Sequence, residues 1–279
     1  MRGSCPCPCE GNRRYGGNTA CVLVEADDPE AESIILDLGT GLRELGLDYH
    51  RTQPFAGVAL VTHLHWDHVQ GLPFFAPILA PGAELDVYGP RQDARNGKST
   101  LEEAFSVFMS PPHFPVRPDE LLGQVRFHDV EREDFSIGSA KVKVRPVPHC
   151  GSTVGFRIEM DGVSLAYVSD HQGPVDPRDH DYIDEGVLEL CDGADLLIHD
   201  AQYRSDEFAL KSDWGHCTVD YALKVADRAG VRHLALFHHD PAHSDDELDR
   251  LQAECQAAAA GTAVDRVTAA AEGLTLRLG

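Results

Sequence analysis

Four residues within six positions carry side chains that bind metal ions: His63, His65, Asp67 and His68. Neutral imidazoles and a carboxylate are nitrogen and oxygen donors that Zn²⁺ takes, with Mn²⁺ and Fe²⁺ as rivals. The apolar, β-branched run 58–62 before them is typical of a buried strand. The four side chains therefore lie on the loop that leaves this strand. Two of them can face one metal and two a neighbouring metal, which indicates more than a single structural ion.

The composition limits the class of protein. The 279 residues suffice for one large domain or two small ones, and 42% hydrophobic with 25% charged residues is ordinary for a globular protein. The formal net charge of −22 predicts a surface that repels phosphate backbones, because nucleic-acid affinity rests mainly on Lys and Arg. We therefore expect a small-molecule substrate rather than a long nucleic acid. A small anion attracted by bound metal ions stays compatible with this charge.

The N-terminal residues have no apolar core of signal-peptide length, and no window of the sequence reaches the length of a membrane span. We expect a cytoplasmic protein without a membrane partner, whose eight cysteines are mostly reduced. Cys5, Cys7 and Cys9 suggest metal or redox chemistry, but the second Cys-x-x-Cys pair of a zinc knuckle is missing. We interpret 5–9 as a proline-stiffened loop with incidental thiols.

Apolar patterns and breakers predict the elements that position these residues. Strands are expected at 19–24, 34–37, 58–62, 85–88, 142–145, 154–158, 163–168, 196–198 and 234–237, and helices at 42–45, from about Val69, at 101–109, at 219–229 and from Ser244 with a capping box to Glu247. Between about 90 and 139 the pattern loosens, and we interpret this region as an irregular elaboration that overhangs the site. The order of strands and helices suits an α/β (α+β) protein. Without a repeat or a long linker, 1–279 is predicted to form one domain.

The motif His-x-His-x-Asp-His after an apolar strand resembles the signature of the metallo-β-lactamase superfamily, hydrolases with a four-layer αββα sandwich and one or two metals. The resemblance implies a third histidine for the first metal, a bridging carboxylate and a last histidine for the second metal. His149 follows a strand, and Asp170 ends the hairpin after it, so the hairpin would bring them together. The last histidine should follow strand 234–237, where His238 and His239 compete. In the family this ligand directly follows the strand, which favours His238.

The resemblance thus implies two divalent metal ions, Zn²⁺ before Mn²⁺ or Fe²⁺. The first metal would be held by three histidines: His63, His65 and His149. The second would be held by Asp67, His68 and His238. Asp170 and a hydroxide would bridge the two metals, and Asp67 would orient this hydroxide as a catalytic residue.

Further stretches resemble ribonuclease Z and related phosphodiesterases: 14–19, Leu197-Ile198-His199-Asp200-Ala201 and Gly215-His216-Cys217-Thr218. The resemblance implies that His216 protonates the leaving oxygen or stabilises charge on phosphorus, and that Asp200 fixes its tautomer. A simpler interpretation places His216 in the cap region of helix 219–229, with Thr218 as the cap; both can hold. Two departures from the family are Asp200 for Glu, which could loosen the contact to His216, and Cys217 for Ser.

The sequence therefore predicts a metal-dependent hydrolase, a dinuclear phosphodiesterase of small substrates such as cyclic nucleotides or cyclic ribose phosphates. Three features argue against other subfamilies. The bridging Asp170 is often absent from related β-lactamases, and flavodiiron relatives usually have Glu at the position of His65. The tRNA endonucleases have a basic protruding arm, which this sequence lacks. A lactonase, thioesterase or β-lactamase-like hydrolase would share the ligands but have no use for His216. A non-catalytic metal-binding sensor would keep the ligands without turnover. A homodimer is compatible with the sequence.

Overall fold

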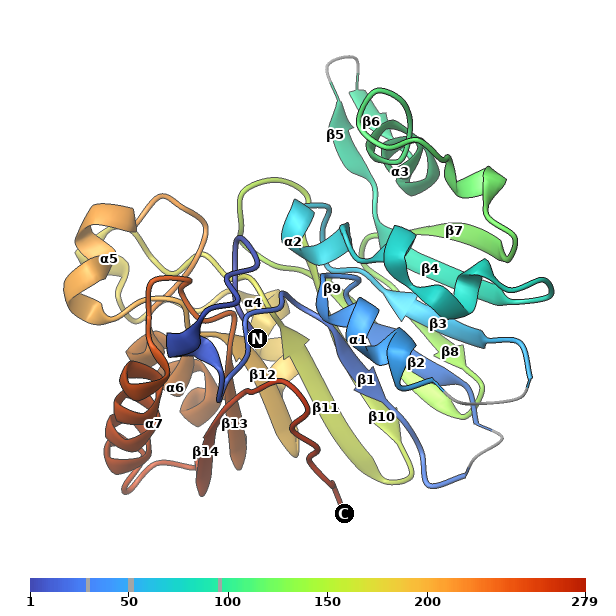
Figure 1. Cartoon of the computed structure of the whole chain (residues 1–279). Helices are drawn as coiled ribbons and strands as arrows, with labels where there is room; N and C mark the ends of the chain where they lie inside the picture. Colours follow the sequence, from blue (N-terminus) through green and yellow to red (C-terminus); the bar gives the residue numbers. More distant parts are fainter. Residues whose placement is uncertain (29–30, 50–52, 95–96) are drawn as a thin grey trace.

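A computed structural model of the chain describes residues 1–28, 31–49, 53–94 and 97–279. In these residues two β-sheets lie face to face, and helices cover their outer faces (Figure 1). The first sheet has the order β1-β2-β3-β4-β7: Val22–Val24, Ser33–Leu36, Ala56–Leu60, Glu84–Pro90 and Gln124–Val130. The second has the order β14-β13-β12-β11-β10-β9-β8: Arg266–Ala269, His233–Phe237, Leu196–Asp200, Val163–Val168, Val154–Met160, Ala140–Pro146 and Asp134–Ile137.

The helices divide between the two outer faces. Those packed on the first sheet are α1 (Gly41–Leu47), α2 (Trp66–Val69), α3 (Leu101–Phe108) and the 3-10 turns η2 (Leu72–Phe74) and η3 (Ala76–Leu79). Those on the second sheet are α4 (Glu185–Cys191), α6 (Val219–Arg228) and α7 (Asp245–Ala258). The hairpin of β5 (Gln92–Ala94) and β6 (Gly97–Ser99) projects together with α3 at one end of the molecule (Figure 1). Helix α5 (Ser205–Lys211) projects at the opposite end. Short 3-10 turns complete the list: η1 (Glu10–Asn12), η4 (Pro118–Glu120) and η5 (Pro177–Asp179).

Side-chain alternation along the strands builds the layers. Ile34 and Leu36 of β2 face the second sheet, where they join Phe156 and Phe237 in the apolar core between the sheets. Ile35, between them, faces the helices on the outside of the first sheet. Strands buried on both faces are apolar throughout, as this run is. The four layers are therefore helices, sheet, sheet and helices, and the predicted αββα sandwich is confirmed.

Parallel pairing brings the carboxyl ends of several strands to one edge of the sandwich. β2 pairs in parallel with β3, and β11, β12 and β13 pair in parallel with one another. β9 runs in the same direction as β11, because both pair antiparallel with β10. Open α/β sheets bind ligands at the carboxyl ends of their strands. The segments that leave β2, β3, β9, β11, β12 and β13 are therefore the ones to search for a site.

Several sequence-based expectations differ from the structure. The prediction that a helix begins near Val69 is wrong. Helix α2 ends at Val69, because Gly71 and Pro73 interrupt the helical pattern. Region 90–139, expected to be irregular, contains β7, which pairs in parallel with β4, and β8 at the edge of the second sheet. Elements α4, α5 and β14 were not predicted. Ser244 caps α7 by accepting from the N–H of Glu247, but the Glu247 carboxylate pairs with Arg204, so half of the expected capping box forms.

None of the helices described is both long and apolar enough to cross a bilayer.

The inter-sheet core predicts where truncation destabilises the fold. Leu196 lies in this core with 4% of its surface exposed, and Leu122 is 68% exposed. We expect Leu196→Ala to lower the free energy of unfolding by about 2–5 kcal/mol, because it removes buried methyl groups and leaves a cavity. Leu122→Ala, the matched control, should change it by less than about 0.5 kcal/mol. Urea unfolding followed by circular dichroism measures both. Equal effects of the two variants would contradict the layered core.

Candidate metal centre

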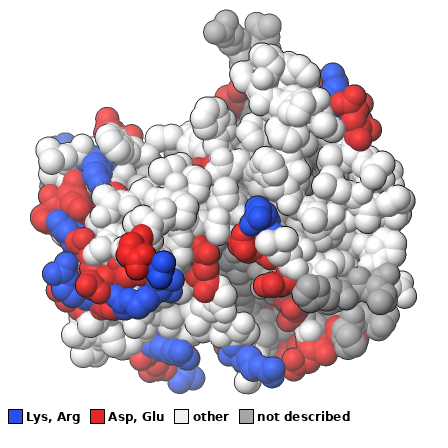
Figure 2. All heavy atoms as spheres, viewed as in Figure 1, with Lys and Arg blue, Asp and Glu red and all other residues white. Residues whose placement is uncertain are grey.

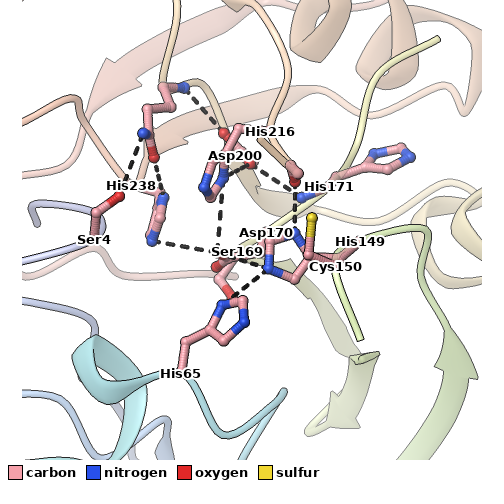
Figure 3. Close-up of polar contacts among 12 residues, drawn as sticks. Ser4, His65, His149, Cys150, Ser169, Asp170, His171, Asp200, His216 and His238 are labelled. Carbon is pink, nitrogen blue, oxygen red and sulfur yellow. Dashed lines mark hydrogen bonds and ion pairs between the residues drawn. The ribbon is translucent and has the colours of Figure 1, made fainter. Parts of the chain in front are cut away.

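The segments that leave these strand ends bring the sequence-predicted site residues together. His63, His65, Asp67 and His68 follow β3, His149 follows β9, Asp170 follows β11, and His238 follows β13. Their potential ligand atoms form groups within 4.8 Å of one another: His63, His65 and His149; Asp67, His68 and His238; and His63, His68 and Asp170. Figure 3 shows His65, His149, Asp170 and His238 directed toward a common centre. The residues expected to hold two metals and their bridge thus lie together. Two further groups within the same range include His216: His149, Asp170 and His216; and Asp200, His216 and His238.

In the first set, three imidazole nitrogens face one another. His65 Nδ1 lies 2.9 Å from His63 Nε2 and 3.2 Å from His149 Nε2. Burial lowers the pKa of all three rings, so at neutral pH they are uncharged and keep a lone pair for a cation. His65 is the most exposed of them and lies where the centre opens to solvent.

The second set surrounds two carboxylates. Asp67 Oδ2 lies 3.0 Å from His238 Nε2 and 3.2 Å from His68 Nε2. Asp170 lies between the sets, with Oδ1 3.1 Å from His68 Nε2 and Oδ2 3.7 Å from His149 Nε2. Burial opposes ionisation of Asp170, but the surrounding histidines outweigh it and hold its pKa well below the usual value. The same balance lowers the pKa of Asp67.

The outward nitrogens of four rings are each committed to an acceptor. His68 Nδ1 donates to Asp37 Oδ2 at 2.8 Å, and His238 Nδ1 donates to Gln202 Oε1 at 2.7 Å. His149 Nδ1 donates to the carbonyl of Gly215 at 2.6 Å, and His63 Nδ1 donates to Thr62 Oγ1 at 3.1 Å. A proton held on the outer nitrogen leaves the inner nitrogen as a lone-pair donor, as in protein metal sites.

The charge of the centre also fits divalent cations. Burial opposes protonation of His68, yet Asp170, Asp67 and Asp37 raise its pKa well above the ordinary value, so this position favours positive charge. Among the residues that the structure describes, the buried Asp170 Oδ1 accepts no hydrogen bond, and His68 Nε2 lies 3.1 Å from it as an ion pair. Lone pairs on the inward nitrogens and ionised carboxylates are the ligands that Zn²⁺ or a similar ion takes. The residues present therefore fit a metal centre.

Asp37 is a residue that the sequence analysis missed. It is fully buried at the end of β2 and accepts from Thr62 N at 2.7 Å, from Tyr167 Oη at 2.8 Å and from His68. Its φ of +57° lies in the left-handed region, which few non-glycine residues adopt. The sequence offered one signal, an aspartate directly after an apolar strand and before Leu38-Gly39. This signal is weak, because a single carboxylate forms no spacing pattern with other metal-binding residues.

His238 and His239 point in different directions. His238 is buried in the centre with a φ of +56°. His239 donates from Nε2 to the carbonyl of Ala270 at 3.0 Å and packs edge-on against Tyr15. The partner of His238, Gln202, was also missed by sequence reasoning, because a glutamine after a strand carries no recognisable pattern.

His216 lies beside both ligand sets and is paired with Asp200. Its Nδ1 donates to Asp200 Oδ2 at 2.8 Å, and its ring stacks on His238 with 4.8 Å between centroids. Asp200 is thus long enough for this contact despite being one methylene shorter than Glu. Burial opposes protonation of His216, but Asp200, Asp170 and other carboxylates outweigh it and raise its pKa above the ordinary value. Thr218 also caps α6 by accepting from Tyr221 N, as the simpler interpretation of this stretch expected, and the pairing of His216 with Asp200 is compatible with that cap.

A layer of buried side chains supports Asp200. The buried Cys217 Sγ donates to the Asp200 carbonyl at 3.2 Å, and so does His199 Nδ1 at 2.7 Å. His171, another residue that sequence reasoning missed, donates its backbone N–H to Asp200 Oδ2 at 3.0 Å, and its Nδ1 lies 3.0 Å from His199 Nε2. Burial lowers the pKa of both histidines, so they are neutral hydrogen-bonding partners.

Comparison with known proteins places the chain among hydrolases of one fold. Residues 33–239 match the family model described as a beta-lactamase superfamily domain. Ribonuclease Z of Kineococcus radiotolerans is 28% identical over 271 residues, covering 83% of this chain and 81% of that protein. The crystal structure of human tRNase Z, short form, has a TM-score of 0.70 at 19% identity and covers 100% of this chain and 97% of its own. A diphosphatase from the PhnP family has a TM-score of 0.63 at 21% identity, covering 94% and 85%. At these identities the two structures show likeness of fold alone.

The hydrogen bonds of Asp37 predict its effect on metal binding. In Asp37→Asn an amide group replaces one acceptor oxygen, so one of its buried donors loses its partner and His68 loses its fixed tautomer. We expect metal affinity to fall about 10–100-fold, the usual loss for a partner of a ligand. Mass spectrometry of metal content after dialysis against a chelator measures this. The control is Asp195→Asn, at the opposite end of β12, where Asp195 accepts from Ser164 N at 2.7 Å. Full metal content in Asp37→Asn would contradict the assignment.

Proposed function

The chain belongs to the metallo-β-lactamase superfamily of metal-dependent hydrolases, and on that premise we propose that it is a phosphodiesterase with a dinuclear metal centre. The observation that carries the proposal is the His216–Asp200 pair beside the two ligand sets. A hydrolase of lactones, thioesters or β-lactams would need the ligand sets alone. A histidine held by a carboxylate next to them is suited to protonating the oxygen that leaves a phosphodiester.

The proposed roles of the ligands follow the groups of nitrogen and oxygen atoms. The first metal, Zn²⁺ before Mn²⁺ or Fe²⁺, would be held by His63, His65 and His149. The second would be held by Asp67, His68 and His238. Asp170 would bridge the two. When bound, such a pair of ions supplies a hydroxide at neutral pH and neutralises charge on a phosphate. Asp67, whose Oδ2 lies 3.0 Å from His238 Nε2, would accept a hydrogen bond from the attacking hydroxide and so orient it.

His216 is proposed as the general acid. Because its Nδ1–H is held by Asp200, Nε2 is the atom that carries the transferable proton in the imidazolium form. Asp200, which is not among the proposed ligands, lies 2.8 Å from Nδ1 and stabilises this form. The supporting layer of His199 and Cys217 fixes the Asp200 backbone, so the ring keeps one orientation. Positioning of this kind is what general acid catalysis requires.

The names of the relatives conflict with the expectation that long nucleic acid is an unfavoured substrate, since they are called ribonuclease Z and tRNase Z. Net charge alone was a poor ground for that exclusion, because it averages over the surface. Figure 2 shows side chains of both signs gathered over α5, α6 and α7, where Arg14 pairs with Asp246, and Arg204 with Glu247. RNA is therefore a second candidate substrate, favoured by these relatives.

We still favour a small phosphodiester as the substrate, because three cationic side chains on the segments around the strand ends are paired with carboxylates. Arg91 lies 3.8 Å from Asp129, Lys98 lies 3.0 Å from Glu131, and Lys211 lies 2.7 Å from Asp240. Among the residues that the structure describes, each of these three cations is thus paired with a carboxylate, whereas long RNA needs unpaired cations grouped into a basic track.

Two further aspects belong to the proposal. We place the protein in the cytoplasm, because its eight cysteines are free thiols, which a reducing compartment maintains.

We also treat residues 1–279 as one domain, since both sheets contribute to the same core and the same site. A non-catalytic metal sensor remains the alternative that turnover measurements decide.

His216→Ala tests the general acid. We expect kcat for a phosphodiester to fall roughly 10²-fold or more, the usual scale for a lost acid, while metal content stays at about two ions per chain. The control is His233→Ala at the opposite end of β13, where His233 Nε2 lies 2.9 Å from Thr268 Oγ1; it should keep full activity. Steady-state kinetics and mass spectrometry supply the two readouts. Loss of metal in His216→Ala would make the residue a ligand instead.

A panel of substrates separates the candidate functions. The wild-type protein should hydrolyse bis-p-nitrophenyl phosphate and cyclic nucleotides, and leave an acyl lactone and nitrocefin intact. A tRNA transcript that is cleaved faster than any small diester, with a rate that falls steeply with salt, would contradict the small substrate and support RNA. Turnover of the lactone or nitrocefin alone would contradict the phosphodiesterase.

A further inference from the structure

A short N-terminal stretch that the proposed mechanism does not use lies against the second ligand set. The Ser4 N–H donates to Asp67 Oδ2 at 2.8 Å. Ser4 Oγ accepts from Gln202 Nε2 at 3.4 Å, and Gln202 Oε1 accepts from His238 Nδ1 at 2.7 Å. Figure 1 shows this segment, in dark blue, running between α5 and α2, and Figure 3 shows Ser4 beside His238. One segment thus contacts a predicted ligand after β3 and the partner of a predicted ligand after β13.

Arg2 holds this segment in place. Its guanidinium is fully buried and donates to the carbonyl of His243 at 2.6 Å and to Asp245 Oδ1 at 3.3 Å. A buried cation is tolerated only where it is paired and hydrogen-bonded. These contacts therefore hold the Arg2 side chain in one conformation. The next peptide is fixed too, because Gly3 N donates to the carbonyl of His239 at 2.9 Å.

The backbone of the segment is fitted closely to the centre. A Cβ on Gly3 would lie 2.3 Å from His238 Nδ1 and 2.7 Å from Gln202 Oε1, so only glycine allows this approach. Ser4 has a φ of +61°, in the left-handed region, and in this conformation its N–H reaches Asp67. An uncommon backbone conformation at a site is expected where the surroundings hold it.

The Ser4 N–H matters because the histidines cannot replace it once a cation is bound. The outward nitrogens of His68 and His238 carry the proton and donate to Asp37 and Gln202. Their inward nitrogens then offer lone pairs and no hydrogen to Asp67. The amide of Ser4 therefore fixes the orientation of the Asp67 carboxylate.

We propose that the segment Arg2-Gly3-Ser4 is a positioning element for the second metal site. Ser4 N–H orients Asp67, Gly3 lets His238 and Gln202 keep their contact, and Arg2 holds both residues in place. The first set, His63, His65 and His149, has no contact with the segment among those described. This inference rests on the dinuclear centre of the proposed function. It predicts that damage to the segment weakens one metal site and spares the other.

Gly3→Ala, with Gly11→Ala as the matched control, tests this. Gly11 belongs to the same N-terminal stretch, but a Cβ there meets nothing closer than Cys9 Sγ at 3.9 Å. Zn²⁺ titration against a competing chelator gives the affinity of each ion, and the absorption spectrum of the Co²⁺ form reports ligand geometry. In Gly3→Ala we expect the second ion to bind about 10–100-fold more weakly, with the first unchanged and an altered Co²⁺ spectrum. Gly11→Ala should match the wild type in both.

Two more variants keep the test decisive if Gly3→Ala does not fold, as judged by circular dichroism. Arg2→Lys keeps the charge but loses the planar fork, so the second ion should again bind more weakly than the first. Ser4→Gly keeps the backbone N–H and fits the positive φ, and loses only the 3.4 Å contact of Ser4 Oγ with Gln202. The second ion should therefore bind more tightly to Ser4→Gly than to Gly3→Ala or Arg2→Lys, and equal weakening in all three variants would overturn the role of the amide.

The outcomes separate this inference from the proposed function. Wild-type affinities for both ions in Gly3→Ala and Arg2→Lys, or equal weakening of both ions, overturn the inference and leave the phosphodiesterase standing. Selective loss of the second ion in a protein that cleaves no phosphodiester supports the inference and overturns the phosphodiesterase. A wild-type chain that binds no divalent ion overturns both.

Discussion

The Asp37 carboxylate receives hydrogen bonds from both sheets, and the site depends on it. Thr62 N donates from the end of β3, in the first sheet, and Tyr167 Oη donates from β11, in the second. His68 Nδ1 donates to the same oxygen as Tyr167. Burial and Asp37 raise the pKa of Tyr167 well above its ordinary value, so its hydroxyl remains a donor. One acceptor thus links the two sheets at this edge, holds the start of the His-x-His-x-Asp-His loop and fixes the tautomer of His68.

Two buried residues leave their strands in a left-handed conformation, one in each sheet. Leu36 and Phe237 face the core between the sheets, so alternation alone would direct Asp37 and His238 toward the outer helices. Their φ values of +57° and +56° break this alternation and return both side chains to the space between the sheets. Each such conformation costs on the order of 1–3 kcal/mol and persists only where surrounding contacts determine it. The acceptors and donors around Asp37 and His238 provide those contacts.

This geometry explains which parts of the site could be predicted from the sequence. The loop after β3 was predictable because its donors are close together and follow an apolar strand. Strand alternation would have selected His239, the residue in phase with Phe237, and only the family resemblance favoured His238. Asp37, Gln202 and the Ser4 amide could not be found this way, because one carboxylate, one amide or one peptide N–H has no periodicity.

The fold was predictable to a similar degree, for similar reasons. Strands β2, β3, β11 and β13 are mostly apolar, and they were predicted to within about two residues of their observed bounds. Strand β7, with the sequence Gln-Val-Arg-Phe-His-Asp-Val, is half-buried along most of its length and so has a weak apolar pattern. It becomes a strand because it pairs with β4 over seven residues, a long-range contact that local sequence does not encode.

The net charge of −22 is a property of the whole chain, and the centre has its own field. Asp37, Asp67, Asp170 and Asp200 surround the imidazoles with four formal negative charges. Two divalent cations would carry the same charge with opposite sign, so an anionic substrate would meet a centre that no longer repels it. Surface carboxylates farther away than about 8 Å are largely screened at physiological salt. Overall charge therefore governs how a long polyanion approaches the surface, and the local balance of cations and carboxylates governs whether a phosphodiester can bind and react.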